Sequence, residues 1–120
     1  MEKEKILGYL VNLLVESHST YKQTQAALDA LEPYPNPDMT PEEIRKSRAE
    51  ENDTFLGIFI GSIEALGAFH FAIGEEEFAQ DLRSSLEERE DPTEEVLPYL
   101  ERVYSVAIIE AAKTSKVPSW

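Results

Sequence analysis

The twenty residues from 55 to 74, FLGIFIGSIEALGAFHFAIG, constrain the fold more than any other part of this sequence. They contain one formal charge, Glu64, and one histidine, His70. The rest of the chain is strongly polar or amphipathic. We therefore expect this stretch to form a central helix that other helices cover and that is buried nearly all round.

The stretch is also about as long as a membrane span, which makes a bilayer helix the first alternative to weigh. Acidic residues flank it on both sides, Glu50, Glu51 and Asp53 before it and three glutamates at 75–77 after it. Neither side has a Lys/Arg cluster or an aromatic belt, and Glu64 would be costly inside lipid. We predict a helix in a protein core and no membrane contact.

Small residues recur at four-residue spacing in this helix, at Gly57, Gly61 and Ala65. Each glycine costs about 1 kcal/mol relative to alanine in a helix, so a compensating contact is expected. Small residues at this spacing let a second helix come close. We expect a helix of the same chain in this groove, with a helix of a second subunit as the alternative.

The overall composition favours one soluble domain spanning residues 1–120. Its 42% hydrophobic content is too high for a disordered chain, and the absence of cysteine excludes disulfides and thiolate chemistry. The start of the chain lacks the pattern of a signal peptide, so we expect a cytoplasmic protein.

Four or five helices and no strands are predicted from the apolar periodicity. The first runs from Glu2 to about Glu32, and a proline-rich connector follows at 33–39. A long second helix runs from Pro41 to about Ile73. Shorter helices are expected at 75–90 and from Asp91 and Pro92 onward, with a kink or a later start at Pro98 and a tail at 113–120. After residue 96 a single inner stripe is expected, with Ala107 on it and Ile109 off it. The expected fold is an all-α, irregular four- to five-helix bundle around the central apolar helix, and we expect a homodimer.

Two local signals fix the ends of the long helix. Thr40 can cap its first turn, Pro41 suits the first helical position, and Glu43 completes a capping box. Gly74 is suited to end it.

The charge is the strongest functional signal, because 24 acids against 11 bases give a net charge of −13. Such a chain repels nucleic acid and is attracted to basic protein surfaces. Residues 75–102 hold eleven acids and three bases. The simpler explanation is a solvated face in which acids near helix N-termini interact favourably with the helix dipoles. As a partner-binding surface, its densest part would be Glu87, Glu88, Glu90, Asp91, Glu94 and Glu95.

The leading hypothesis is therefore a non-enzymatic module that binds a partner with a basic surface and inhibits or modulates it. Small, acidic, cysteine-free helical proteins of this kind serve as immunity proteins, anti-activators and phage inhibitors of host nucleic-acid machinery. A structural subunit of a larger assembly is a further hypothesis. No cofactor, metal site or catalytic residue is predicted.

An enzymatic alternative is a magnesium-dependent helical nucleoside triphosphate pyrophosphatase, since such enzymes hold magnesium between carboxylates on neighbouring helices. Its candidate residues are Lys46, Glu50, Glu51, Asp53, Glu77 and Asp81, and Thr54 stands where another acid is needed. Neither His18 nor His70 follows a glutamate at the di-iron spacing. We expect Glu64 to face solvent or to find a partner such as His18, Lys22 or Tyr104, and His70 to be a core or partly exposed histidine and not a ligand.

Overall fold

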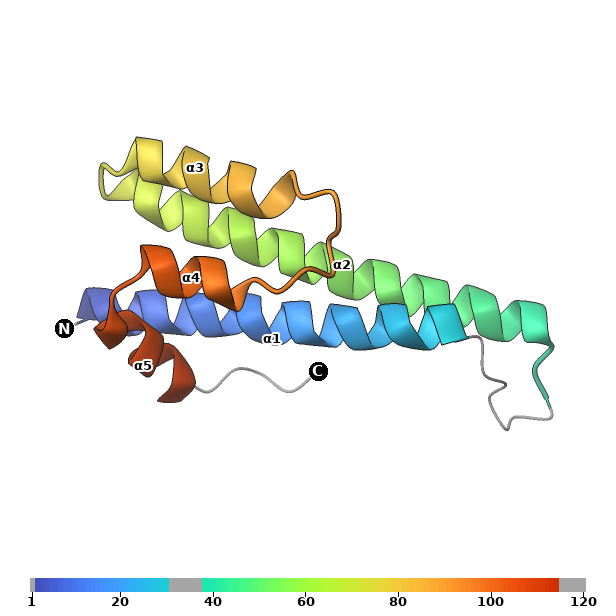
Figure 1. The fold of residues 1–120 in the computed structure, drawn as a ribbon. Helices are drawn as coiled ribbons and strands as arrows, with labels where there is room; N and C mark the ends of the chain where they lie inside the picture. Colours follow the sequence, from blue (N-terminus) through green and yellow to red (C-terminus); the bar gives the residue numbers. More distant parts are fainter. Residues whose placement is uncertain (1, 31–37, 115–120) are drawn as a thin grey trace.

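A computed structural model describes residues 2–30 and 38–114, which are mostly α-helical. Figure 1 shows two long antiparallel helices, α1 and α2, with three shorter helices packed on them near the N-terminus. The described residues contain no strand, which confirms the all-α bundle. The helices are α1 (Glu2–Ala30), α2 (Pro41–Ala72), α3 (Glu76–Glu87), α4 (Leu97–Val103) and α5 (Val106–Thr114).

Both predicted ends of α2 are confirmed. The Thr40 hydroxyl accepts the N–H of Glu43, and the Glu43 carboxylate accepts the N–H of Thr40, which completes the capping box. At the other end Gly74 adopts a φ of +88°, the N–H of Gly74 bonds to the Phe71 carbonyl, and the N–H of Glu75 bonds to the His70 carbonyl. This pair of bonds is a Schellman motif, which requires a left-handed residue and so favours glycine.

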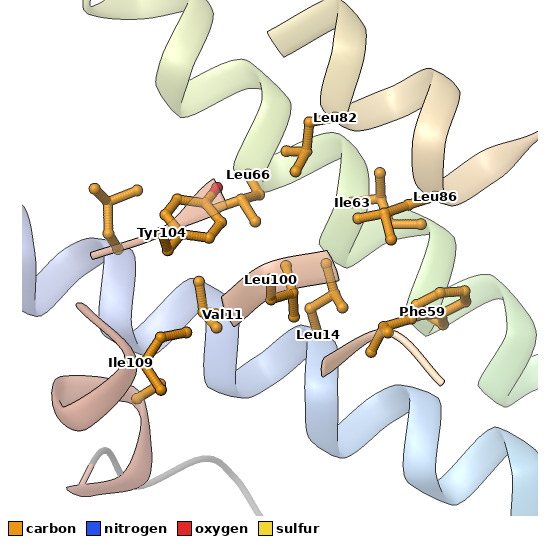
Figure 2. Packing of buried hydrophobic residues seen from close by; sticks show 13 residues of the cluster. Val11, Leu14, Phe59, Ile63, Leu66, Leu82, Leu86, Leu100, Tyr104 and Ile109 are labelled. Carbon is orange, nitrogen blue, oxygen red and sulfur yellow. The ribbon is translucent and has the colours of Figure 1, made fainter. Parts of the chain in front are cut away.

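The core lies between α1, α2 and the shorter helices. Buried residues of α1 recur at alternating four- and three-residue spacing, so that they line one face of the helix. Figure 2 shows side chains from all five helices pointing toward one another: Val11, Leu14, Phe59, Ile63, Leu66, Leu82, Leu86, Leu100, Tyr104 and Ile109. Each large aliphatic side chain buried this way stabilises the fold by about 1.5–3 kcal/mol relative to its exposed state.

Beyond this core, the second half of α1 and the first half of α2 continue as a two-helix arm (Figure 1). Ile44 is buried there, and the amide of Asn52 donates to the Thr24 hydroxyl at 2.9 Å and to the Tyr21 carbonyl at 3.3 Å. Arg48 donates to the Ala27 carbonyl at 3.1 Å. Polar contacts therefore join the arm where apolar residues are scarce.

The helix predicted to start at Asp91 and Pro92 does not form. The Asp91 carboxylate accepts the N–H and the hydroxyl of Thr93, at 2.9 and 2.6 Å, and so closes a local turn instead of capping a helix. Helix α4 begins only at Leu97, with Pro98 in its first turn, which is the later start that this proline had suggested.

The predicted single inner stripe after residue 96 is also wrong in detail. Tyr104 is extended, with φ −108° and ψ 150°, and this residue separates α4 from α5. The break resets the helical phase, so that Ile109 is buried although the uninterrupted pattern placed it off the stripe. For the same reason Ala107, expected inside, is exposed.

The prediction that residues 55–74 are buried nearly all round is wrong. Of the large side chains, Ile60 is 41% and Phe71 60% exposed. The added helices cover one side of the α1–α2 pair, so the other side of α2 remains open. An added Cβ at Gly57 or at Gly61 would meet nothing within 4 Å, so the expected packing of the small-residue groove against a helix of the same chain is wrong as well.

Two predicted segments fall largely outside the described residues. The proline-rich connector was predicted at 33–39, and only Asp38 and Met39 of it are described. In the predicted tail at 113–120, Lys113 and Thr114 form the end of α5, and the remaining residues are not described.

Candidate protein-binding surfaces

The acidic segment, residues 87–95, begins at the last residue of α3 and continues through the loop that leads to α4. Arg89 lies inside this loop, and its side chain is 11% exposed. Its guanidinium donates to the main-chain carbonyl oxygens of Glu94 and Glu95. Arg89, the basic residue within the segment, therefore stabilises the conformation of the loop.

Two residues of α1 fix the same loop to the bundle. His18 Nε2 donates to the Pro92 carbonyl oxygen at 2.8 Å, since a carbonyl can only accept. The His18 ring is buried against Phe59, with 4.6 Å between ring centroids, and this burial lowers the pKa of His18. Lys22 forms an ion pair with Glu95. The acidic loop is thus a fixed surface of the protein.

All six predicted partner-binding acids are exposed, but they differ in what they contact. Glu95 is bound to Lys22, whose hydrogen bond lowers the pKa of Glu95. The hydrogen bonds from Thr93 likewise lower the pKa of Asp91. The Glu94 carboxylate forms an ion pair with Arg89, with 3.7 Å between Glu94 Oε2 and Arg89 Nη2.

Glu88 and Glu90 differ from the other acids of the segment. Both are exposed, and neither carboxylate forms a hydrogen bond or ion pair within the described part of the chain. They are the carboxylates of the segment that remain fully available to an outside partner.

Glu87 is turned toward α2 and belongs to a separate cluster. Partial desolvation of its carboxyl group, followed by its hydrogen bond to Glu64 and the charge of Glu64, raises the pKa of Glu87 to about 7. Arg83 bridges the cluster, with 3.1 Å between its Nη2 and Glu64 Oε2. Glu64 therefore faces solvent as expected, but its partner is Arg83 and none of the three residues proposed from sequence. Gly67 leaves space for Arg83, since an added Cβ would stand 2.8 Å from Nε.

His70 is a core histidine, as expected, and it forms the centre of a buried hydrogen-bond chain. Its Nδ1 donates to the Glu75 carboxylate at 2.8 Å, so its Nε2 accepts from the Tyr104 hydroxyl, also at 2.8 Å. The hydrogen bond from His70 lowers the pKa of Glu75, and burial raises the pKa of Tyr104.

This hydrogen-bond chain joins the end of α2 to the start of α3 and to the end of α4. A phenol with a raised pKa stays protonated, so Tyr104 is not activated as a nucleophile. The adjacent cavity, lined by residues that include Lys3 and Phe78, has a volume of about 160 Å³. This volume is below the roughly 300–1,000 Å³ that is typical of ligand pockets. The hydrogen-bond chain is therefore best explained as a structural contact that holds the three helices together.

The residues of the magnesium hypothesis lie in two separate places. Glu50, Glu51 and Asp53 are on the arm half of α2, whereas Glu77 and Asp81 are on α3. Asp53 lies about 28 Å along the helix axis from the end of α2, at about 1.5 Å per residue, and α3 begins near that end. Within residues 2–30 and 38–114, no group of three or more histidine or acidic side chains is arranged to hold a metal.

The open side of the α1–α2 pair is a second candidate surface, which the sequence had not indicated for α1. Ile6 and Tyr9 of α1 are 46% and 38% exposed, and Phe71 of α2 is 60% exposed. By length and composition α2 could also cross a membrane, a property that core helices of soluble proteins share.

Comparison of the chain with protein-family models, with characterised proteins and with solved structures found no match.

Proposed function

We propose that this protein is a non-enzymatic module that binds a partner through the acidic segment and modulates it by covering a basic surface. The observation that supports this proposal is the arrangement of bases around the loop at 88–96. Arg89 and Lys22 are bound to the loop itself, so that Glu88 and Glu90 extend from a fixed backbone without a counter-charge. A pre-formed row of carboxylates loses little conformational freedom when it binds.

A complementary surface would be rich in lysine and arginine, such as the phosphate-binding face of a nucleic-acid-binding protein. Electrostatic attraction of this kind accelerates association and is weakened by salt. Occupying that face would exclude nucleic acid from it, and this competition is the proposed mode of modulation.

The test is affinity capture from a lysate of the source cell with three forms of the protein. The wild type is compared with Glu88→Lys/Glu90→Lys and with the matched control Glu50→Lys/Glu51→Lys. The control changes net charge equally at exposed sites on the arm. We expect one basic protein to be captured by the wild type and the control, to be lost with the first variant, and to be released by added DNA. Equal capture of the same protein by all three forms would show that the acidic segment is not the binding surface.

A further inference from the structure

The open side of the α1–α2 pair has the properties of a subunit interface. We call it the back face and define it by Ile6, Tyr9 and Leu13 of α1 and Gly61, Ala65 and Ala68 of α2. It lies opposite the core. On α1, Leu7 and Leu14 are fully buried against the core, and helical geometry places Tyr9 and Leu13 about 160° and 120° away from Leu7.

The same geometry holds on α2. Leu66 is fully buried, and Ala68 and Gly61 lie about 160° and 140° from it round the helix. Ala65 is also exposed. Helices α5 and α3 pack along other sides of the pair, at Gly8 and at Gly67, and leave this side uncovered.

The exposed apolar area is large for a chain of this size. Ile6 and Tyr9, with Ile60 and Phe71 at the margins of the back face, leave roughly 370 Å² of side chain exposed, taking about 200 Å² for a whole large apolar side chain. The largest apolar patch on a monomer is typically about 300–600 Å² and is often functional. The small residues and Leu13 enlarge the patch toward the roughly 800 Å² per partner of a stable interface.

The distribution of charge indicates which molecule would bind the back face. The six residues that define the back face include no acidic or basic side chain. Exposed Lys5 and Glu16 border it on α1, and Glu64, which lies on the same side of α2, is paired with Arg83. The whole chain nevertheless has a net charge of −13. A partner attracted by electrostatics would dock on the acidic surfaces, whereas a second copy of this chain, itself strongly acidic, would meet the least repulsion on the face with the fewest charges.

We propose that two copies of this chain associate through their back faces. The α1–α2 pair of one subunit then packs face to face against the α1–α2 pair of the other, and the four helices form two layers. Gly61, Ala65 and Ala68 let the paired helices approach closely, while Ile6, Tyr9 and Leu13 fill the space beside them. This inference goes beyond the proposed function and does not depend on it.

The dimer has a consequence for the arrangement of the acidic segments. The loop at 88–96 packs on His18, a buried residue on the core side of α1, and so lies away from the back face. A back-to-back dimer would carry its two acidic segments on opposite outer surfaces and could bind two basic partners at once.

Sedimentation equilibrium across the micromolar range tests the proposal. The wild type is expected at twice its 13.6 kDa chain mass. Ala65→Glu should weaken dimerisation by roughly a hundredfold or more, because each subunit would bury an uncompensated carboxylate. The matched control Ala107→Glu, which adds the same charge at an exposed site on α5, should stay dimeric. Circular dichroism of each variant verifies that it is folded.

Salt dependence gives an independent result. Association of two acidic chains should tighten as salt rises, because screening reduces their repulsion. A wild type that stays monomeric would overturn the proposal, and so would a dimer that Ala65→Glu leaves unchanged. A monomer that instead sediments with neutral phosphatidylcholine vesicles would assign the back face to lipid and overturn it as well. None of these outcomes bears on capture through the acidic segment.

Discussion

Replacing Gly8 with alanine should destabilise the protein, although the same replacement at Gly61 should stabilise it. Both residues lie inside long helices, and alanine favours the helix over glycine by about 1 kcal/mol at each position. The two sites differ in what a new methyl group would meet. At Gly61 there is open space within 4 Å, so the full gain of about 1 kcal/mol is expected.

At Gly8 the new Cβ would stand 2.6 Å from the Cβ of Ala111, 2.9 Å from its carbonyl carbon and 3.0 Å from the nitrogen of Ala112. Two of these three atoms are backbone, so no side chain can rotate away and α5 would have to shift. Overpacking of this kind costs about 1–3 kcal/mol. It would also loosen the buried contacts of Ile109, which adds to the cost. We expect a net loss of about 1–2 kcal/mol, which places the two variants about 2–3 kcal/mol apart.

Urea unfolding followed by far-ultraviolet circular dichroism measures this difference. Both variants are made in the Ala65→Glu background, so that self-association through the back face does not contribute. The urea midpoint should fall with Gly8→Ala and rise with Gly61→Ala. If Gly8→Ala stabilised the protein as much as Gly61→Ala does, α5 would not pack on α1 at Gly8 and the reasoning would be refuted.

Two further predictions concern titration and buried hydrogen bonding. The raised pKa of Glu87 means that its contribution to stability is present below the ordinary value of 4.5 and is lost as the pH rises through about 7. Above pH 7, Glu87→Gln should therefore have a higher free energy of unfolding than the wild type, by at most about 1 kcal/mol because the pair with Glu64 is exposed. If urea unfolding gave the same stability difference between the two proteins below pH 4.5 and above pH 7, this prediction would be contradicted. Tyr104→Phe should lower the free energy of unfolding by about 1–3 kcal/mol, because His70 Nε2 would be left buried without a donor, whereas the control Tyr99→Phe should change it little. Equal effects of the two tyrosine substitutions would refute the role of this bond.

Local signals in the sequence predicted most of the helices and both ends of α2. The capping box at Thr40 and the left-handed residue Gly74 depend on a few neighbouring residues, so the sequence alone is sufficient to recognise them. The same local reasoning failed at Asp91. An aspartate before a proline is a good helix cap, but its carboxylate bonds equally well to the backbone two residues on, and here the docking of the loop on His18 favours the turn.

The candidate surfaces required the tertiary structure. The acidic character of residues 87–95 was evident from the sequence, but the division between bound and available carboxylates was not. Lys22 and His18 are more than seventy residues from their partners in the loop, and no periodicity links them. Likewise, the proximity of Glu64 and Glu87 exists only because α3 folds back along α2.

By itself the sequence determined that the apolar residues from 55 onward lie in a long helix that ends just before Gly74, because composition and end signals act within a few turns. Which side of that helix would be covered was decided only by the tertiary structure. Apolar periodicity shows that a side chain can be buried, but burial depends on where the other helices pack. In this fold α3, α4 and α5 cover the core side of the α1–α2 pair, and Gly57, Gly61 and Ala65 stay open on the other.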